Sequence, residues 1–111
     1  MITVTVDRKL GTRHPKHKSI IYKVNYGYVK GIIAPDNEEQ DAYVLGVYEP
    51  IDSFEGELIA IIKRHNDIED KWVVANKDFT VKEIRELTHF QEQYFDIEII
   101  KVNNKEDQNE I

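Results

Sequence analysis

Apolar residues along this chain recur mainly at every second position or in short β-branched runs. Alternation is typical of a strand with one buried face, and a short continuous apolar run is typical of a strand buried on both faces. Turn-forming residues such as glycine and proline separate these segments. The pattern predicts strands at Ile2–Val6, Ile20–Val29 with a continuation over Gly31–Ala34, Ala42–Tyr48, Leu58–Ile62, Lys71–Ala75 and Ile97–Val102.

The range Ile20–Val29 has the most regular alternation. Successive side chains of a strand point to opposite faces, so the pattern assigns each residue to one side. The side that we expect to be buried carries Ile20, Tyr22, Val24, Tyr26 and Tyr28. The opposite side carries Lys23, Asn25 and Gly27.

One late segment has helical spacing instead. Thr80 and Glu83 form the T-x-x-E capping box, and Asp78 adds negative charge near the predicted N-terminus. The apolar residues that follow at helical spacing, and that we expect to face a core, are Ile84, Leu87, Phe90 and Tyr94. Many short strands with a single late helix predict a mainly β fold with one C-terminal helix, in the form of a small OB-like β-barrel.

Length and composition agree with one small domain. A chain of 111 residues predicts a single β-barrel domain over residues 1–102, and the polar segment 103–111 predicts a disordered tail. The sequence has no cysteine, no signal-peptide core and no apolar run near the ~20 residues of a membrane span. We therefore expect a soluble, cytoplasmic protein that does not contact membranes. A net charge of −6 argues against a nucleic-acid partner.

Charge is distributed unevenly along the chain. Between Asp7 and Asp36 there is no acidic residue. This interval contains His14, His17 and the basic residues Arg8, Lys9, Arg13, Lys16, Lys18, Lys23 and Lys30. Two interpretations remain open: a solvated basic loop, or an anion-binding rim that faces a cation-binding rim.

Two acidic clusters are candidates for metal binding. The first consists of Asp36, Glu38, Glu39 and Asp41, and its carboxylates suit Mg²⁺, which prefers oxygen ligands. An exposed acidic turn after Pro35 explains the same residues. In the second cluster, an extended segment would place Asp67, Glu69 and Lys71 on one face. That arrangement would serve either a metal and a phosphate or a charged hairpin tip.

Other side chains offer less specific chemistry. Tyr22, Tyr26 and Tyr94 are candidate donors to phosphate oxygens, although buried tyrosines usually serve the core. His65 and His89 have no partner at metal-ligand spacing, and neither serine lies in a nucleophile elbow. A glycine-rich phosphate loop is missing as well.

The order of short motifs is more specific than any one of them. It runs from V-D-R at residues 6–8 through Y-K-V-N-Y-G-Y at residues 22–28 to D-N-E-E-Q-D at residues 36–41. E-D-K at residues 69–71 then precedes a valine-rich strand, and H-F-Q-E-Q-Y occupies residues 89–94. Over roughly residues 4–95, this order resembles that of the soluble family I inorganic pyrophosphatases.

The resemblance implies an OB-like barrel that hydrolyses pyrophosphate, or a related phosphoanhydride, to phosphate with Mg²⁺, or with Mn²⁺ in its place. It also implies a homo-oligomer. Glu38 takes the position of the residue that activates water. The implied metal ligands are Asp36, Asp41, Asp67 and Glu69. The implied substrate-binding residues are Arg8, Tyr22, Tyr26, Lys71 and Tyr94.

The sequence departs from the family pattern in several places. Lys23 stands where proline is usual, Glu38 replaces an aspartate, and Phe95 replaces a basic residue. The family's N-terminal segment has no counterpart, so we expect a short, divergent member. The long span after Arg8 offers Arg13, Lys16 or Lys18 as substitutes for it. Two other functions stay open: a weak or inactive barrel that binds a phosphorylated metabolite or nucleotide, and a structural protein.

Overall fold

The computed structural model describes residues 1–102 of the chain, which form six strands and one helix. In chain order, these elements are β1 (Ile2–Arg8), β2 (Asn25–Ile33), β3 (Glu39–Val44), β4 (Ser53–Arg64), β5 (Asp70–Ala75), α1 (Val81–Glu92) and β6 (Ile97–Lys101). The tail predicted at 103–111 lies outside the described residues. Among residues 1–102, no helix is long and apolar enough to cross a membrane.

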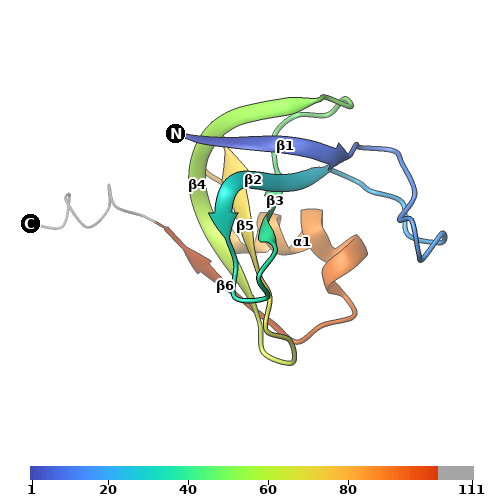
Figure 1. Ribbon diagram of the computed structural model, residues 1–111, viewed down its shortest axis with the longest axis vertical. Coiled ribbons are helices and arrows are strands. Elements are labelled where there is room, and N and C mark those ends of the chain that lie inside the picture. Colours follow the sequence, from blue (N-terminus) through green and yellow to red (C-terminus); the bar gives the residue numbers. More distant parts are fainter. Residues whose placement is uncertain (103–111) are drawn as a thin grey trace, which may run out of the picture.

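Five of the strands close into a barrel (Figure 1). They are ordered β1-β2-β3-β5-β4, and β4 pairs with β1 to complete the ring. Neighbouring strands are antiparallel except β3 and β5, which run parallel. Closure leaves no free edge inside the ring, and β6 extends the sheet from β4. The predicted mainly β barrel with one helix near the C-terminus is therefore confirmed.

The length of β4 allows one strand to serve three neighbours. The strand has twelve residues, and the first few pair with β1, where Val4 lies opposite Phe54. Near its end the same strand pairs with β6, where Ile61 lies opposite Ile100. The opposite edge of β4 pairs with β5. The sequence pattern predicted only Leu58–Ile62 for this strand, because Glu55 and Glu57 interrupt its apolar run.

Close contact between β1 and β2 depends on one glycine. A Cβ atom at Gly27 would lie 1.8 Å from the backbone oxygen of Thr5, which is far inside van der Waals contact. Only a residue without a side chain therefore permits this strand pairing. Gly27 therefore holds β1 and β2 together at the position next in sequence to Tyr26.

Apolar side chains gather in two clusters on either side of the barrel wall. Strand parity separates them, since alternate residues of β3 and β5 belong to different clusters. The interior cluster consists of Val4, Val6, Val29, Ala42, Val44 and Val74. The outer cluster includes Tyr26, Tyr43, Val73 and Ile84, so it packs α1 against the wall.

The capping box begins α1 as predicted. The Thr80 hydroxyl accepts a hydrogen bond from the Glu83 amide at 3.1 Å, and the Thr80 amide donates to the Glu83 carboxylate at 2.8 Å. Ile84 is buried, whereas Tyr94 is 60% exposed. The expectation that Tyr94 faces the core is wrong, because α1 ends at Glu92 and the chain turns before Tyr94.

Two other predicted boundaries differ from the structure. The second strand begins at Asn25 rather than Ile20, and the Asn25 side chain is buried rather than exposed. Its oxygen accepts from the Leu10 amide at 2.9 Å, and its nitrogen donates to the Glu49 carbonyl at the same distance. The third strand ends at Val44 because the chain turns at Gly46, whose φ is +93°.

Candidate functional site

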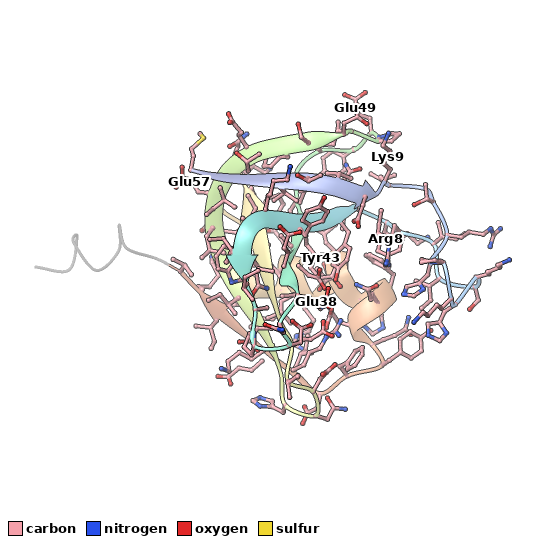
Figure 2. The ribbon with its side chains drawn as sticks, in the orientation of Figure 1. Arg8, Lys9, Glu38, Tyr43, Glu49 and Glu57 are labelled. Carbon is pink, nitrogen blue, oxygen red and sulfur yellow. The ribbon has the colours of Figure 1, made fainter. Side chains whose placement is uncertain are left out.

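A cavity of about 720 Å³ opens on the outer wall of the barrel, beside the end of α1. Its lining comes from the end of β1, the β1–β2 connection, strands β2 to β5, the last turn of α1 and the segment that follows α1. The β1–β2 connection and α1 lie on the same side of the barrel (Figure 1). Arg8 points from the end of β1 toward α1, whereas Lys9 points away from it (Figure 2). Segments far apart in the sequence therefore build one concave surface.

The centre of the cavity is a lysine between two carboxylates. The Lys71 Nζ donates to Asp41 Oδ2 at 2.6 Å and also to Glu69 Oε1. Parallel pairing of Ala42 with Trp72 brings Asp41 beside Lys71, one step along the register. Glu69 precedes Lys71 by two residues, and the two-residue period places both on one side. We call Asp41, Glu69 and Lys71 the lysine cluster.

Burial within the lysine cluster is uneven. The Lys71 side chain is only 4% exposed, but the side chains of Asp41 and Glu69 are 36% and 32% exposed. A buried ammonium is stable only with paired negative charge, which both carboxylates supply. Their free lone pairs face the cavity. The cluster can therefore exchange one partner for a ligand.

Tyr26 forms the wall next to the lysine cluster. Its ring centroid lies 5.9 Å from the Lys71 Nζ and 4.8 Å from the Tyr43 ring centroid. Burial raises the pKa of Tyr26 well above its ordinary value, and the negative charge of Asp41 adds to the increase. The hydroxyl therefore stays protonated at neutral pH and can donate a hydrogen bond.

A second charged group lies where α1 meets the barrel, and its Arg64 also lines the cavity. The Arg64 Nε and Nη2 donate to the two carboxylate oxygens of Glu92 at 2.9 and 2.7 Å. Tyr43 donates to the same carboxylate at 2.6 Å, and Figure 2 shows Tyr43 pointing toward α1. The Arg64 guanidinium also lies 3.7 Å from the centroid of the Phe95 ring. We call Arg64, Glu92 and Tyr43 the arginine cluster.

Hydrogen bonds connect the arginine cluster to Arg8. Gln91 Nε2 donates to the Tyr43 hydroxyl at 2.7 Å, and Gln91 Oε1 accepts from the Tyr22 hydroxyl at 2.7 Å. Arg8 in turn donates to the Tyr22 hydroxyl at 2.8 Å. Tyr22 is fully buried. It therefore orients Arg8 at the cavity wall and does not itself line the cavity.

Sequence reasoning did not identify Arg64, Tyr43, Gln91 or Glu92. A signal existed, because Ile84, Gln91 and Glu92 are seven and eight positions apart and so share one helical face. Polar residues on an apolar helical face indicate buried partners. The partner Arg64 was not recognisable, because it ends a strand that the pattern predicted to stop at Ile62.

Six of the ten predicted site residues line the cavity, namely Arg8, Tyr26, Asp41, Glu69, Lys71 and Tyr94. Asp36, Glu38, Tyr22 and Asp67 are not part of its lining. The Asp36 carboxylate accepts from the Glu38 amide at 3.1 Å within the β2–β3 turn. Asp67 lies 3.7 Å from the Arg64 guanidinium. Structure therefore separates the two halves of the first acidic cluster.

The β1–β2 connection contributes imidazoles rather than the basic residues that we considered as substitutes for Arg8. His14, His17 and Ser19 line the cavity, while Arg13, Lys16 and Lys18 do not. Arg13 instead donates to the Lys18 carbonyl at 2.8 Å. Arg8 itself reaches the cavity and needs no substitute.

The donor set limits what metal could bind. Within residues 1–102, no group of three or more histidine and acidic side chains is placed to hold a metal ion. Mg²⁺ usually takes one or two carboxylates together with waters and substrate phosphates. Asp41 and Glu69 fit that requirement for a single hydrated ion that arrives with a phosphate ligand. The ammonium of Lys71 would then have to move from between them.

No protein-family model matches the chain, and the search of curated proteins found no match. Solved structures are similar, however. An inorganic pyrophosphatase from Ehrlichia chaffeensis superposes with a TM-score of 0.66 at 16% identity, covering 86% of this chain and 81% of that one. The chain has the fold of the inorganic pyrophosphatases.

Two further structures support this conclusion. An inorganic pyrophosphatase from Neisseria gonorrhoeae gives a TM-score of 0.64 at 15% identity, covering 83% of this chain and 72% of that one. An inorganic pyrophosphatase from Coxiella burnetii gives a TM-score of 0.61 at 15% identity, covering 97% of this chain and 88% of that one. Identities this low establish a shared pyrophosphatase fold, and the activity of this chain has to be argued from its own residues.

Proposed function

We propose that this protein is a pyrophosphatase-like hydrolase that binds pyrophosphate or a related phosphoanhydride in the cavity and hydrolyses it to phosphate. The observation that carries the proposal is the lysine cluster, which opens onto the cavity beside Arg8 and Tyr26. The shared pyrophosphatase fold supports it. The homo-oligomeric state implied by the resemblance and the cytoplasmic location expected from the sequence remain predictions.

The cationic and hydroxyl groups around the cavity would bind the phosphates. Arg8 presents a planar set of donors that matches phosphate oxygens, and Lys71 adds a second positive charge. Tyr26 donates from its protonated hydroxyl. These groups would also neutralise charge that develops on the leaving phosphate, which is usually the largest contribution to such reactions.

Asp41 and Glu69 are the residues that would hold Mg²⁺, or Mn²⁺ in its place. Bound there, the ion would polarise a phosphoryl oxygen and lower the pKa of a bound water. Lys71 would donate to the phosphate once the ion and the ligand share its carboxylates. The cluster thus has a role both with and without ligand.

A second candidate function is binding without turnover. The resemblance assigns water activation to Glu38, yet Glu38 lies in the β2–β3 turn and outside the cavity lining. Hydrolysis through Glu38 therefore requires this turn to move toward the cavity, whereas binding does not. A barrel that binds a phosphorylated metabolite or nucleotide would need only Arg8, Tyr26 and the lysine cluster.

Phosphate release from pyrophosphate with Mg²⁺ tests the proposal. We expect turnover by the natural chain and a strong reduction in Asp41→Asn. Glu57→Gln is the matched control, because Glu57 is exposed on β4 and points away from Arg8 (Figure 2). Release that stays at background with Mg²⁺, Mn²⁺ and Co²⁺ would contradict hydrolysis. Thermal stabilisation by pyrophosphate and metal in that case would select the binding function.

Glu38→Gln separates the two candidates further. Under the hydrolase proposal it lowers phosphate release and leaves pyrophosphate affinity unchanged. If the protein only binds its ligand, Glu38→Gln changes neither quantity. Neither turnover nor stabilisation by any of these ligands would leave a structural role for the barrel.

A further inference from the structure

The cavity is larger than pyrophosphate requires. Its volume of about 720 Å³ lies within the range of about 300–1,000 Å³ that pockets for drug-sized ligands occupy. The charged part of its lining consists of the lysine cluster, Asp7, Arg8 and Arg64, with Tyr26 beside them. The remaining part, which we call the ring-lined half, consists of His14, His17, Tyr94 and Phe95 together with Ser19, Ile20 and Gln91.

The histidine wall of the ring-lined half is held by backbone hydrogen bonds. The His14 amide donates to the Ile20 carbonyl at 2.8 Å, and the Tyr22 amide donates to the Thr12 carbonyl at 2.8 Å. Arg13 and Ile21 form an antiparallel bridge between these two bonds. The β1–β2 connection is therefore a paired loop with a fixed shape, and its imidazoles have defined positions.

The orientation of His14 leaves a donor free. Its Nδ1 accepts from the amides of Lys16 and His17 at 3.0 and 3.1 Å. In the neutral ring the proton must then lie on Nε2, which becomes a donor. The His14 ring lies nearly parallel to the Tyr22 ring, at 11° and 6.1 Å, and 5.0 Å from the His17 ring.

The segment after α1 adds aromatic rings to the ring-lined half. Tyr94 lines the cavity and is 60% exposed, so its ring is available to a ligand. Phe95 lies next to it, fixed against the Arg64 guanidinium at 3.7 Å. An exposed tyrosine and two imidazoles in one cavity lining are unnecessary for a small inorganic anion. Aromatic and imidazole rings bind flat ligand groups by stacking.

We propose that the ligand of this cavity is an organic phosphoanhydride with a flat ring, of the nucleoside diphosphate class, rather than inorganic pyrophosphate alone. The inference rests on the proposed function, because it places the diphosphate at Arg8, Tyr26 and Lys71. The flat ring then lies in the ring-lined half between His17 and Tyr94. His14 Nε2 supplies a hydrogen bond to the ligand's polar edge.

Calorimetric titration of the full chain with Mg²⁺ tests this inference with three probes: inorganic pyrophosphate, methyl diphosphate and adenosine diphosphate. Each probe carries a methylene group in place of its bridging oxygen, so that the protein cannot hydrolyse it. Methyl diphosphate carries the same diphosphate linkage without the ring. Stacking of one base is worth about 1–3 kcal/mol, so adenosine diphosphate should bind roughly tenfold tighter than methyl diphosphate. Tyr94→Ala should remove most of this difference, and Tyr94→Phe should keep it.

Tyr48→Ala is the matched control, because Tyr48 is 70% exposed and does not line the cavity. It should leave all three affinities unchanged. Equal affinities for the two organic probes, or an equal effect of Tyr94→Ala on both, would overturn the inference and leave the proposed function standing. Failure of all three probes to bind would overturn both. Tight binding of inorganic pyrophosphate with exclusion of adenosine diphosphate would overturn the inference alone.

Discussion

Two clusters in this protein pair a cation with carboxylate oxygens, and their burial differs. In the arginine cluster, the side chains of Arg64 and Glu92 are 6% and 1% exposed, and Tyr43 completes the coordination of the carboxylate. In the lysine cluster, Lys71 is equally buried, but about a third of each carboxylate side chain reaches the cavity. The arginine cluster is almost closed to solvent, with Arg64 alone at the cavity wall, whereas both carboxylates of the lysine cluster are open to the cavity.

The difference indicates separate roles. A buried, fully hydrogen-bonded ion pair holds α1 against the barrel, and removal of one partner would leave a buried charge. A carboxylate at the C-terminal end of a helix is also unfavourable for the helix dipole, and Arg64 offsets this for Glu92. The lysine cluster keeps free lone pairs, so it can accept a metal or a phosphate. Stability should therefore depend on the first cluster and ligand binding on the second.

The largest effect on folding is expected from Glu92→Gln. It removes the bidentate partner of the buried Arg64 guanidinium and leaves only the more distant Asp67 carboxylate at 3.7 Å. Breaking a buried ion pair typically costs about 3–5 kcal/mol of unfolding free energy. Urea denaturation measures the loss. The exposed pair of Lys9 and Asp52 is the control, and Asp52→Asn should change stability little. The double variant Arg64→Met with Glu92→Leu removes both charges and should recover much of the lost stability. No recovery would contradict the assignment of that loss to the Arg64 charge that has lost its Glu92 partner.

Lys71→Met should lower activity strongly and stability only slightly. Removing one positioned donor at a charged site usually lowers the rate by about 10²–10³, so phosphate release should fall by that order. The freed carboxylates of Asp41 and Glu69 can hydrate through the cavity, so the stability loss should be smaller than for Glu92→Gln. Divalent cations should also raise the melting temperature of Lys71→Met more than that of the natural chain. Equal loss of stability in both variants would erase the distinction between the clusters.

Tyr22→Phe tests the hydrogen bonds that connect the arginine cluster to Arg8, and its expected effect on stability is smaller. It removes the hydroxyl that accepts from Arg8 and donates to Gln91, at an expected cost of about 1 kcal/mol. Arg8 loses its orientation, so pyrophosphate affinity should weaken as well. Urea denaturation and calorimetric titration measure the two effects. Reduced stability with unchanged affinity would show that Tyr22 serves the core alone.

The smallest effect concerns pH and His14. Partial burial lowers the pKa of His14, and the charges of Arg8, His17 and Lys16 lower it further. The folded protein then binds fewer protons than the unfolded chain near pH 6.5, so this group's contribution to stability falls as pH falls through that range. Proton NMR titration should show a pKa below the ordinary value that rises when a diphosphate binds. His14→Asn should remove the pH-dependent contribution.

Much of the fold was predictable because it follows from local signals. The capping box of Thr80 and Glu83, the alternation around Tyr26 and the valine run before Ala75 each depend on a few neighbouring residues. Boundaries failed where long-range contacts override these signals. Asn25 is buried because it bonds two distant backbone groups, and β4 extends through Glu55 and Glu57 because barrel closure needs a long strand.

The part of the site that strand pairing brings together was predictable. Asp41, Glu69 and Lys71 meet because β3 and β5 run parallel. The resemblance in motif order had assigned all three residues to one site. Asp36 and Glu38 instead lie in the β2–β3 turn, where Asn37 has a φ of 70°, and neither lines the cavity. The arginine cluster was missed because no short-range pattern connects Arg64 with Glu92 across 28 residues.

Calorimetric titration of pyrophosphate whose bridging oxygen is replaced by a methylene group, so that it cannot be hydrolysed, tests the central claim most directly. It is carried out with Mg²⁺ present on the natural chain and on Lys71→Met. The claim is that the open lysine cluster, and not the buried arginine cluster, receives the phosphate. A hydrogen bond to a charged group is worth about 1.5–3 kcal/mol, so Lys71→Met should weaken binding at least tenfold or so. Equal affinity of the two proteins for this pyrophosphate analogue would contradict the account.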